Sequence, residues 1–281
     1  MSMFCYQCEQ TVQGTGCTKF GACGKDPQTS GLQDLLIYVT KGISAYAHRA
    51  RQFGAIDHDV DVYVTEALFT TVTNVNFDPQ RVAALVLKGA EVRDRARNLY
   101  ETAAREAGQE PEVLTGASGW TPAQDQAGLD AQAAALGIQS RMTRLGEDIT
   151  GLQELLTYGL KGTAAYADHA LILGQEDASV YAYFHEALNL LTRDDASVDE
   201  LLGCCLKCGE VNLTVMGLLD TANTSTYGHP VPTPVRVEPV AGKAILVSGH
   251  DLKDLEELLK PTEGQGIHIY TPRALLPPPG S

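Results

Sequence analysis

The chain has 281 residues, of which 44% are hydrophobic and 20% charged, and its formal net charge is −14. This composition is ordinary for a soluble globular protein, and the length predicts two domains. The 21 Lys and Arg residues form no visible basic patch, which argues against nucleic acid as a partner. No run approaches the roughly eighteen apolar residues of a membrane span, and no signal peptide precedes the first cysteine. We therefore expect a cytoplasmic protein with no membrane contact.

The N-terminal segment holds four of the seven cysteines, Cys5, Cys8, Cys17 and Cys23, with glycines between them. Thiolates bind soft metals in tetrahedral sites. Glycines let the backbone fold tightly enough for four sulfurs to converge. Residues 1–27 are therefore predicted to form a metal-binding loop.

Three kinds of site compete for this loop. A disulfide framework fits poorly, because a chain of this length without an apolar leader does not look secreted. Structural zinc sites also use four thiolates, but usually in two short knuckles, and here only Cys5 and Cys8 form one. An iron–sulfur cluster accepts wider spacing and favours nearby glycine, since backbone N–H groups can then approach inorganic sulfur. The spacing alone ranks the iron–sulfur cluster first and leaves the other two open.

The residues around these cysteines resemble one family. The segment Met3–Gln10, followed by Cys17 and then by Cys23–Lys25, is similar to the N-terminus of the hybrid-cluster (prismane) proteins, known as hydroxylamine reductases. The resemblance implies that the cysteine quartet holds a cubane cluster. It further implies that the compact spacing corresponds to the 4Fe-4S form of the family rather than to its 2Fe-2S form, and it argues against zinc.

The resemblance also implies an activity. Family members reduce hydroxylamine to ammonia and water, and nitric oxide reduction or protein S-nitrosylation in nitrosative stress are alternative family roles. We expect electrons from a redox partner, either a reductase or a ferredoxin-like protein, to enter at the 4Fe-4S cluster. They would then pass to a second, hybrid iron–sulfur–oxygen cluster. The expected small-molecule substrate is hydroxylamine or nitric oxide.

An internal repeat organises the middle of the chain. Residues 31–54 and 151–174 are identical at thirteen of twenty-four positions. Capping-box patterns at Ser30 and Thr150 predict where the first helix of each copy begins. Two more helical patterns follow in each copy, at residues 60–74 and 79–106 in the first and at 177–192 and 197–222 in the second. The duplication predicts two three-helix bundles, over residues 28–106 and 148–225.

The repeat keeps a glycine inside each first helix, at Gly42 and Gly162. Glycine in a helix interior costs about 1 kcal/mol relative to alanine, so we expect a close helix crossing at both positions. Residues 107–147, between the copies, are predicted to form an exposed connection that contains one weak helix and no functional residues.

The three remaining cysteines, Cys204, Cys205 and Cys208, lie in the third helix of the second copy. Cys204 and Cys208 are four residues apart, a spacing that two metal ligands could use. Leucines at positions 201, 202 and 206 surround them, however, and free cysteine behaves as a small buried apolar residue. We therefore interpret these cysteines as packing residues.

The C-terminal part of the chain is predicted to have a different fold class from the helical repeat. Four prolines within residues 226–243 bar a helix and mark a linker. The linker is followed by patterns for a buried strand at 244–248, a helix from residue 252 and a second strand at 267–270. This order predicts the start of a Rossmann-like parallel βαβ domain over 244–281. The predicted fold class is mainly α followed by α/β.

His250 follows the first of these strands. Ligands bind at the carboxyl ends of strands in open α/β sheets, although a histidine there can also be purely structural. The segment 248–255 resembles the family's string around a histidine that ligates the hybrid cluster. By this resemblance His250 is a candidate catalytic residue and metal ligand.

Two departures from the family concern that second cluster. Ala274 stands where the family has a glutamate ligand, and no cysteine follows Cys208. We expect the resemblance to cover about the first half of a family member, with the hybrid cluster incomplete and this chain by itself inactive on hydroxylamine. The alternative to a reductase is then a truncated module that binds the 4Fe-4S cluster and transfers electrons.

Overall fold

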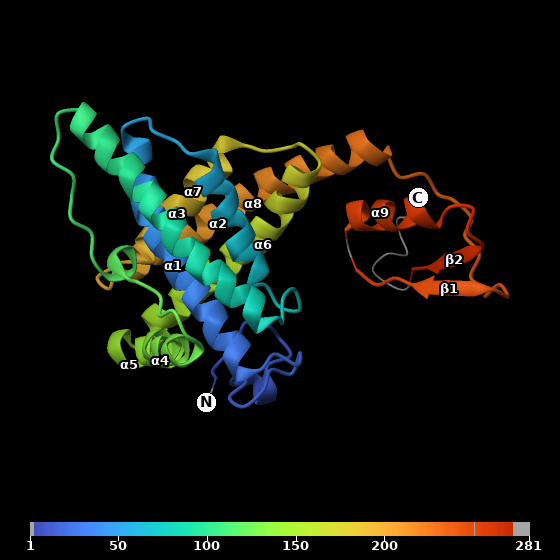
Figure 1. Cartoon of the computed structure of the whole chain (residues 1–281), viewed down its shortest axis with the longest axis horizontal. Coiled ribbons are helices and arrows are strands. Elements are labelled where there is room, and N and C mark those ends of the chain that lie inside the picture. The colour runs from blue at the N-terminus through green and yellow to red at the C-terminus, as the bar shows by residue number, and fades with distance from the viewer. Residues whose placement is uncertain (1–2, 250, 272–281) are drawn as a thin grey trace. The chain divides into compact units, whose positions relative to one another are not determined.

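The computed structural model of the chain describes residues 3–249 and 251–271 (Figure 1). The chain divides into two compact units. The first consists of Met1–Asp168 and Asp177–Val215, and the second of His169–Glu176 and Met216–Ser281. The elements of the chain, in order, are η1 (Val12–Gly14), α1 (Pro27–Gln52), α2 (His58–Thr70), α3 (Pro79–Glu106), η2 (Gly116–Gly119), α4 (Gln126–Leu136), α5 (Ile138–Leu145), α6 (Glu147–Ile172), α7 (Ala178–Leu190), α8 (Val198–Tyr227), β1 (Lys243–Leu246), α9 (Leu252–Thr262) and β2 (Ile267–Tyr270). The predicted α-rich class with a small parallel sheet is confirmed.

The long helices of the two copies begin earlier than their capping boxes predict. The Asp26 carboxylate accepts the N–H of Thr29 at 2.6 Å, and Pro27 occupies the first turn. An aspartate N-cap followed by proline is a strong start signal, because proline lacks the N–H that would otherwise go unpaired. Helix α6 likewise begins at Glu147. The prediction that Ser30 and Thr150 start these helices is wrong.

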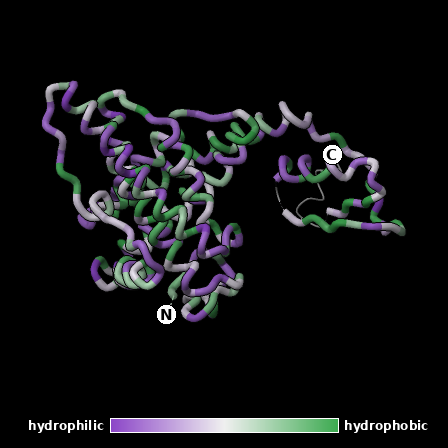
Figure 2. The backbone as a smooth tube through the Cα atoms, viewed as in Figure 1, coloured by the Kyte–Doolittle hydropathy of each residue, from purple (hydrophilic) through white to green (hydrophobic). Residues whose placement is uncertain are grey.

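The internal repeat appears in the lengths of the helices. Helices α1 and α6 each have 26 residues, and α2 and α7 each have 13. Helix α1 packs against α3 of its own copy and also against α7 of the other copy. Hydrophobic and hydrophilic residues alternate along these helices (Figure 2). The largest fully buried apolar side chains come from both copies: Leu32, Leu35, Leu36, Ile43, Leu68, Leu156, Leu160, Phe184, Leu188 and Leu201.

A buried polar network joins the two copies. The His185 ring on α7 lies 3.0 Å from the Ser44 hydroxyl on α1 and 2.8 Å from the Asp61 carboxylate on α2. Arg51 donates to the other oxygen of Asp61 at 2.6 Å. Burial lowers the pKa of His185, which favours its neutral form. Ser44, His185 and Asp61 are all buried, so this serine, histidine and aspartate hold helices together and are not open to a substrate.

The two repeated glycines do not lie at helix crossings, and that prediction is wrong. A methyl group on Gly42 would come within 2.7 Å of the Ala117 carbonyl carbon in η2, so the close neighbour is a short turn of the connection. At Gly162 no atom lies within 4 Å of the corresponding position among the described residues. The repeated glycine therefore has a packing reason in only one copy.

This asymmetry predicts opposite effects of the same substitution. Gly42→Ala is expected to destabilise the protein by about 1–3 kcal/mol, because the added methyl group forces η2 away from α1. Gly162→Ala is expected to stabilise it by up to about 1 kcal/mol, because alanine loses less entropy in a helix. Urea unfolding of the two variants measures both effects, and equal losses would contradict the assigned contact.

The connection between the copies is more ordered than its composition predicts. It contains η2 and two helices, and α4 packs against α1. Trp120 makes an edge-to-face contact with Tyr38 at 5.6 Å between ring centroids, and Arg93 donates to the Trp120 carbonyl. These aromatic and hydrogen-bond contacts fix the connection on the bundle.

Helix α8 is buried along one narrow side, at Leu201, Cys208, Val215 and Ala222. Leu202 and Leu206 are 46% and 67% exposed, so the prediction that they enclose the cysteines is wrong. Contrary to the expectation that no segment approaches a membrane span, helix α8 is long and apolar enough to cross a membrane by length and composition alone, and 17% of its most apolar stretch is buried. Core helices of soluble proteins pass the same test, so this is weak support for a span.

The second unit contains the predicted βαβ element. Strands β1 and β2 pair in parallel from Lys243 with Ile267 to Leu246 with Tyr270, and α9 connects them (Figure 1). The prediction that β1 is buried is wrong: Leu246 is 73% exposed. A sheet of two strands with one helix leaves much of its surface uncovered.

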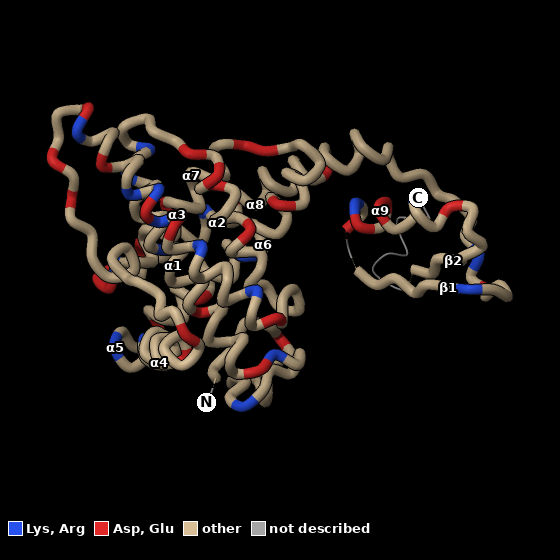
Figure 3. The backbone as a smooth tube through the Cα atoms, in the orientation of Figure 1, with Lys and Arg blue, Asp and Glu red and all other residues tan. Residues whose placement is uncertain are grey.

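Charged residues are spread over both units. Lys and Arg are scattered among the more numerous Asp and Glu, and in the described part of the chain they gather in no single patch (Figure 3).

Candidate metal centre

The N-terminal loop is closed by two of its cysteines. The Cys5 N–H donates to the Cys17 carbonyl at 3.1 Å, and the Cys17 N–H donates to the Cys5 carbonyl at 2.8 Å. The Thr11 hydroxyl donates to the Cys5 carbonyl at 3.1 Å from within the loop. Cysteines twelve positions apart are thereby held side by side.

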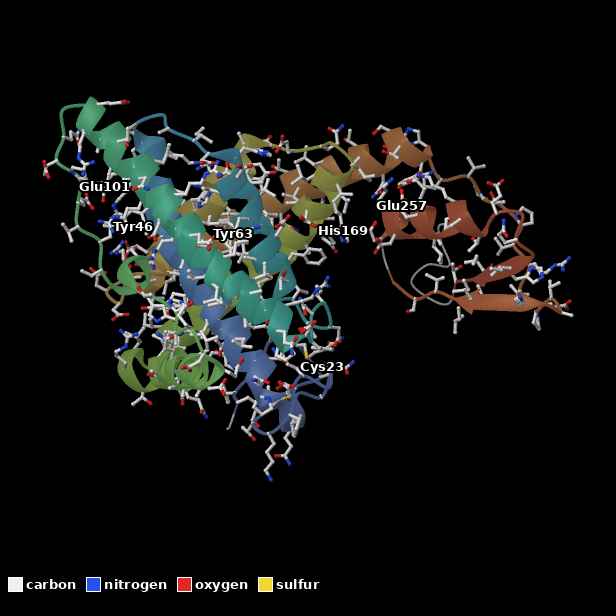
Figure 4. The ribbon with its side chains drawn as sticks, viewed as in Figure 1. Cys23, Tyr46, Tyr63, Glu101, His169 and Glu257 are labelled. Carbon is white, nitrogen blue, oxygen red and sulfur yellow. The ribbon has the colours of Figure 1, made fainter. Side chains whose placement is uncertain are left out.

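All four predicted cysteines line one pocket. Its other lining residues come from the same loop, from the start of α1 and from the segment after α2: Gln7, Thr11, Gly21, Ala22, Lys25, Gln33, Val72, Thr73, Asn74 and Phe77. The lining contains no carboxylate and no histidine, and its one charged side chain is that of Lys25. Figure 4 labels Cys23 in this loop, far along the helices from Glu101. Four soft thiol donors without hard oxygen ligands suit iron–sulfur groups or zinc, and not calcium or magnesium.

Two glycines allow the tight course of the loop. Gly16 has a φ of 145°, and a methyl group there would lie 2.7 Å from the Phe4 ring. A methyl group on Gly21 would lie 2.9 Å from the Cys23 sulfur. Only glycine lets the backbone pass this close to an aromatic ring and to a thiol, so the tight course of the loop accounts for glycine at these two positions.

A backbone N–H and a side-chain hydroxyl lie close to the Cys17 sulfur. The Ala22 N–H donates to this sulfur at 3.4 Å, and the Thr11 hydroxyl lies 3.7 Å from it. Burial alone raises the pKa of the Cys17 thiol, but backbone hydrogen bonds at Val12 and Ala22 outweigh burial and lower the pKa. The Cys17 thiol therefore ionises more readily than an unperturbed thiol, and thiolate is the form that binds metals.

The sulfurs surround the pocket without meeting at one point. Within residues 3–249 and 251–271, no three Cys, His, Asp or Glu side chains are placed where they could share one metal ion. The lining residues fit a thiolate-bound group in their chemistry, and the ligand assignment of Cys5, Cys8, Cys17 and Cys23 stays a prediction.

Gln7 anchors the first cysteine pair to both repeat copies. Its amide nitrogen donates to the Thr73 hydroxyl at 3.0 Å and to the Thr71 carbonyl at 3.3 Å, just after α2. Its amide oxygen accepts from the Lys161 ammonium of α6 at 2.9 Å. The residue between Cys5 and Cys8 is thus held from two sides.

A second glutamine anchors the end of the loop in the same way. Lys25 donates to the Gln33 side-chain oxygen at 2.9 Å, and the Gln33 amide nitrogen donates to the Asn76 carbonyl at 3.0 Å. Both sides of the pocket therefore carry a lysine–glutamine pair tied to the segment between α2 and α3.

Charged side chains of α1 and α6 interact electrostatically with one another near this pocket. Asp34 and Lys41 of α1 occupy the repeat positions of Glu154 and Lys161 of α6. Burial raises the pKa of Asp34 to about 6 and lowers the pKa values of Lys41 and Lys161 to about 7 and about 8. At Glu154, the cations Arg141 and Lys41 outweigh burial and lower the pKa. This group is called the interior ionic cluster below.

Sequence reasoning missed Gln7, Lys25, Gln33 and Lys161 as neighbours of the cysteines. One signal was available: a lysine kept at equivalent positions of two otherwise apolar helix faces is costly to bury and needs a partner. The partner of Lys161 lies 154 residues away, which no local pattern reveals.

The other three cysteines lie away from the pocket. Cys204, Cys205 and Cys208 do not line the pocket, and Tyr183 donates to the Cys204 carbonyl at 2.7 Å. His250 and Ala274 lie outside the described residues. Asp251, next to His250, caps α9 by accepting the Lys253 N–H at 2.7 Å.

Comparison with known proteins agrees with the cysteine pattern. The model of the prismane/CO dehydrogenase family matches residues 3–278. A hydroxylamine reductase of Rhodospirillum rubrum is 52% identical over 278 residues, which are 99% of this chain and 51% of that protein. A hydroxylamine reductase of Syntrophobacter fumaroxidans is 51% identical over 278 residues, 99% of this chain and 50% of that protein.

A more distant relative gives the same coverage. The hydroxylamine reductase of Methanocella arvoryzae is 46% identical over 275 residues, 98% of this chain and 50% of that protein. The chain therefore spans about half the length of the curated relatives it matches. Because the family match runs over nearly every residue and includes the cysteine loop, the chain belongs to the prismane/CO dehydrogenase family.

Proposed function

We propose that Cys5, Cys8, Cys17 and Cys23 hold a 4Fe-4S cluster and that this cluster is the point at which electrons enter. The single observation that carries the proposal is one pocket lined by four thiols and by no carboxylate or histidine. Membership of a family whose relatives are hydroxylamine reductases favours iron and sulfide over zinc, which the same thiols could bind.

The protein's own residues have three tasks at this pocket. The paired backbone of Cys5 and Cys17 fixes the distance across the loop. Gln7 and Gln33 hold the loop on the helices, and the Ala22 N–H donates to the Cys17 sulfur. When bound, a cubane cluster would supply one-electron transfer, which none of these side chains performs by itself.

The activity proposed for the complete protein is reduction of hydroxylamine, with two electrons and two protons, to ammonia and water. The name of the relatives supports it. His250 is proposed as a ligand of a hybrid cluster at the carboxyl end of β1, where open parallel sheets place ligands. The β1–α9–β2 element is then the start of a Rossmann-like domain. A redox partner in the cytoplasm would donate the electrons.

Reversible reduction tests this proposal. The anaerobically purified chain is expected to show a broad visible absorbance that dithionite bleaches and air restores, together with a paramagnetic signal in the reduced state. Purified protein that is colourless and contains zinc would refute the cluster assignment.

A further inference from the structure

The interior ionic cluster and Lys25 together contain more positive than negative groups. The cations are Lys25, Lys41, Arg141 and Lys161, and the carboxylates are Asp34 and Glu154, so four positive groups face two negative ones when all are ionised. Lys25 and Lys161 are only 7% and 8% exposed. An uncompensated buried charge is strongly unfavourable, so such a group either loses its proton, as the lowered pKa of Lys41 favours, or is stabilised by a nearby anion.

The cysteine pocket adjoins this excess charge. Lys25 itself lines the pocket, and Lys161 reaches the pocket-lining Gln7 at 2.9 Å. Lys25 also lowers the pKa of Lys161, as expected of two cations close enough to repel each other. At a pKa of about 8, Lys161 still carries its proton at pH 7. An anionic group in the pocket would relieve this repulsion.

We propose that Lys161, with Lys25, raises the reduction potential of the iron–sulfur group held by the four cysteines. This inference rests on the proposed function. An iron–sulfur group on four thiolates gains a negative charge when it is reduced, and its potential depends on net charge and solvent exposure. A buried ammonium one glutamine away stabilises the reduced form more than the oxidised form, because little solvent screens the interaction. Lys161 is a positioning and tuning residue and not a ligand.

The test is a redox titration of anaerobically purified chains at pH 7, followed by visible absorbance. Lys161→Met and Lys161→Gln both remove the charge, and the glutamine variant can keep a hydrogen bond to Gln7. Both are expected to move the midpoint potential to a more negative value at unchanged iron content. Lys161→Arg keeps the charge and is expected to keep the potential. The matched control Lys88→Met removes an exposed lysine of α3 and is expected to shift nothing.

The possible outcomes separate this inference from the assignment of the cluster. Wild-type chain without iron would refute the proposed function. Iron-loaded Lys161→Met and Lys161→Gln with the wild-type potential would refute only the tuning role. If both uncharged variants lose iron while Lys161→Arg keeps it, the charge is needed to hold the anionic group, which supports the electrostatic role. If Lys161→Arg also loses iron, the electrostatic role of Lys161 is refuted and a steric role is favoured.

Discussion

A Cys8→Ser variant is expected to purify without visible absorbance and without the iron and sulfide of the wild-type chain. A serine hydroxyl is a poor substitute for thiolate on iron, because oxygen is a harder ligand than sulfur. Cys8 belongs to the knuckle that Gln7 fixes to both repeat copies, so a neighbouring residue cannot readily replace it. Absorbance and iron analysis of parallel anaerobic preparations measure the effect.

The control for this variant changes the three other cysteines, Cys204, Cys205 and Cys208, together to alanine. These residues do not line the pocket, so iron content is expected to stay at the wild-type level. Stability should fall by a few kcal/mol, roughly, because Cys208 is buried and its removal leaves a small cavity. Loss of the absorbance from this triple variant would show that helix α8 supplies a ligand.

Asp61→Ala is expected to destabilise the fold by about 3–5 kcal/mol. The substitution removes the carboxylate that accepts from both Arg51 and His185, and it leaves a guanidinium and an imidazole with unmet hydrogen bonds in the interior. Because this network joins helices of both repeat copies, the loss should appear in the global unfolding transition. Urea unfolding followed by circular dichroism measures it.

Asp59→Ala is the matched control, two residues earlier on the same helix. The Asp59 side chain is 74% exposed and pairs with Arg95, whose side chain is 51% exposed. Surface ion pairs contribute about 0–1 kcal/mol, so this variant should unfold almost as the wild-type chain does. Equal losses in the two variants would mean that the Asp61 network contributes no more than a surface pair.

Local patterns in the sequence were sufficient to predict the long helices of the repeat and the order of the strand–helix–strand element, but not the two helices α4 and α5 of the connection. The 3.6-residue periodicity located α3, and the 120-residue repeat predicted that α6 and α7 copy α1 and α2. The strand–helix–strand pattern after the prolines likewise predicted β1, α9 and β2. These features depend on side chains within a few turns of one another, which the sequence displays directly.

Long-range contacts could not be predicted in the same way. His185 and Asp61 are 124 residues apart, and neither position has the same residue in the other copy of the repeat. The capping box at Ser30 failed because the preceding Asp26 and Pro27 make a stronger helix start, and the Gly162 crossing failed because the two copies have different neighbours. The cysteine quartet could be proposed from spacing and glycine content, whereas the charges behind it required the packing of α1 and α6.

Iron, acid-labile sulfide and zinc measured per chain in anaerobically purified protein show directly whether the N-terminal loop holds a cluster. About four iron and four sulfide are expected for each chain, with zinc below one equivalent, because four thiolates around one pocket complete a single cubane. Stoichiometric zinc with no sulfide, or iron that survives the Cys8→Ser substitution unchanged, would contradict the assignment of the N-terminal loop as an iron–sulfur site.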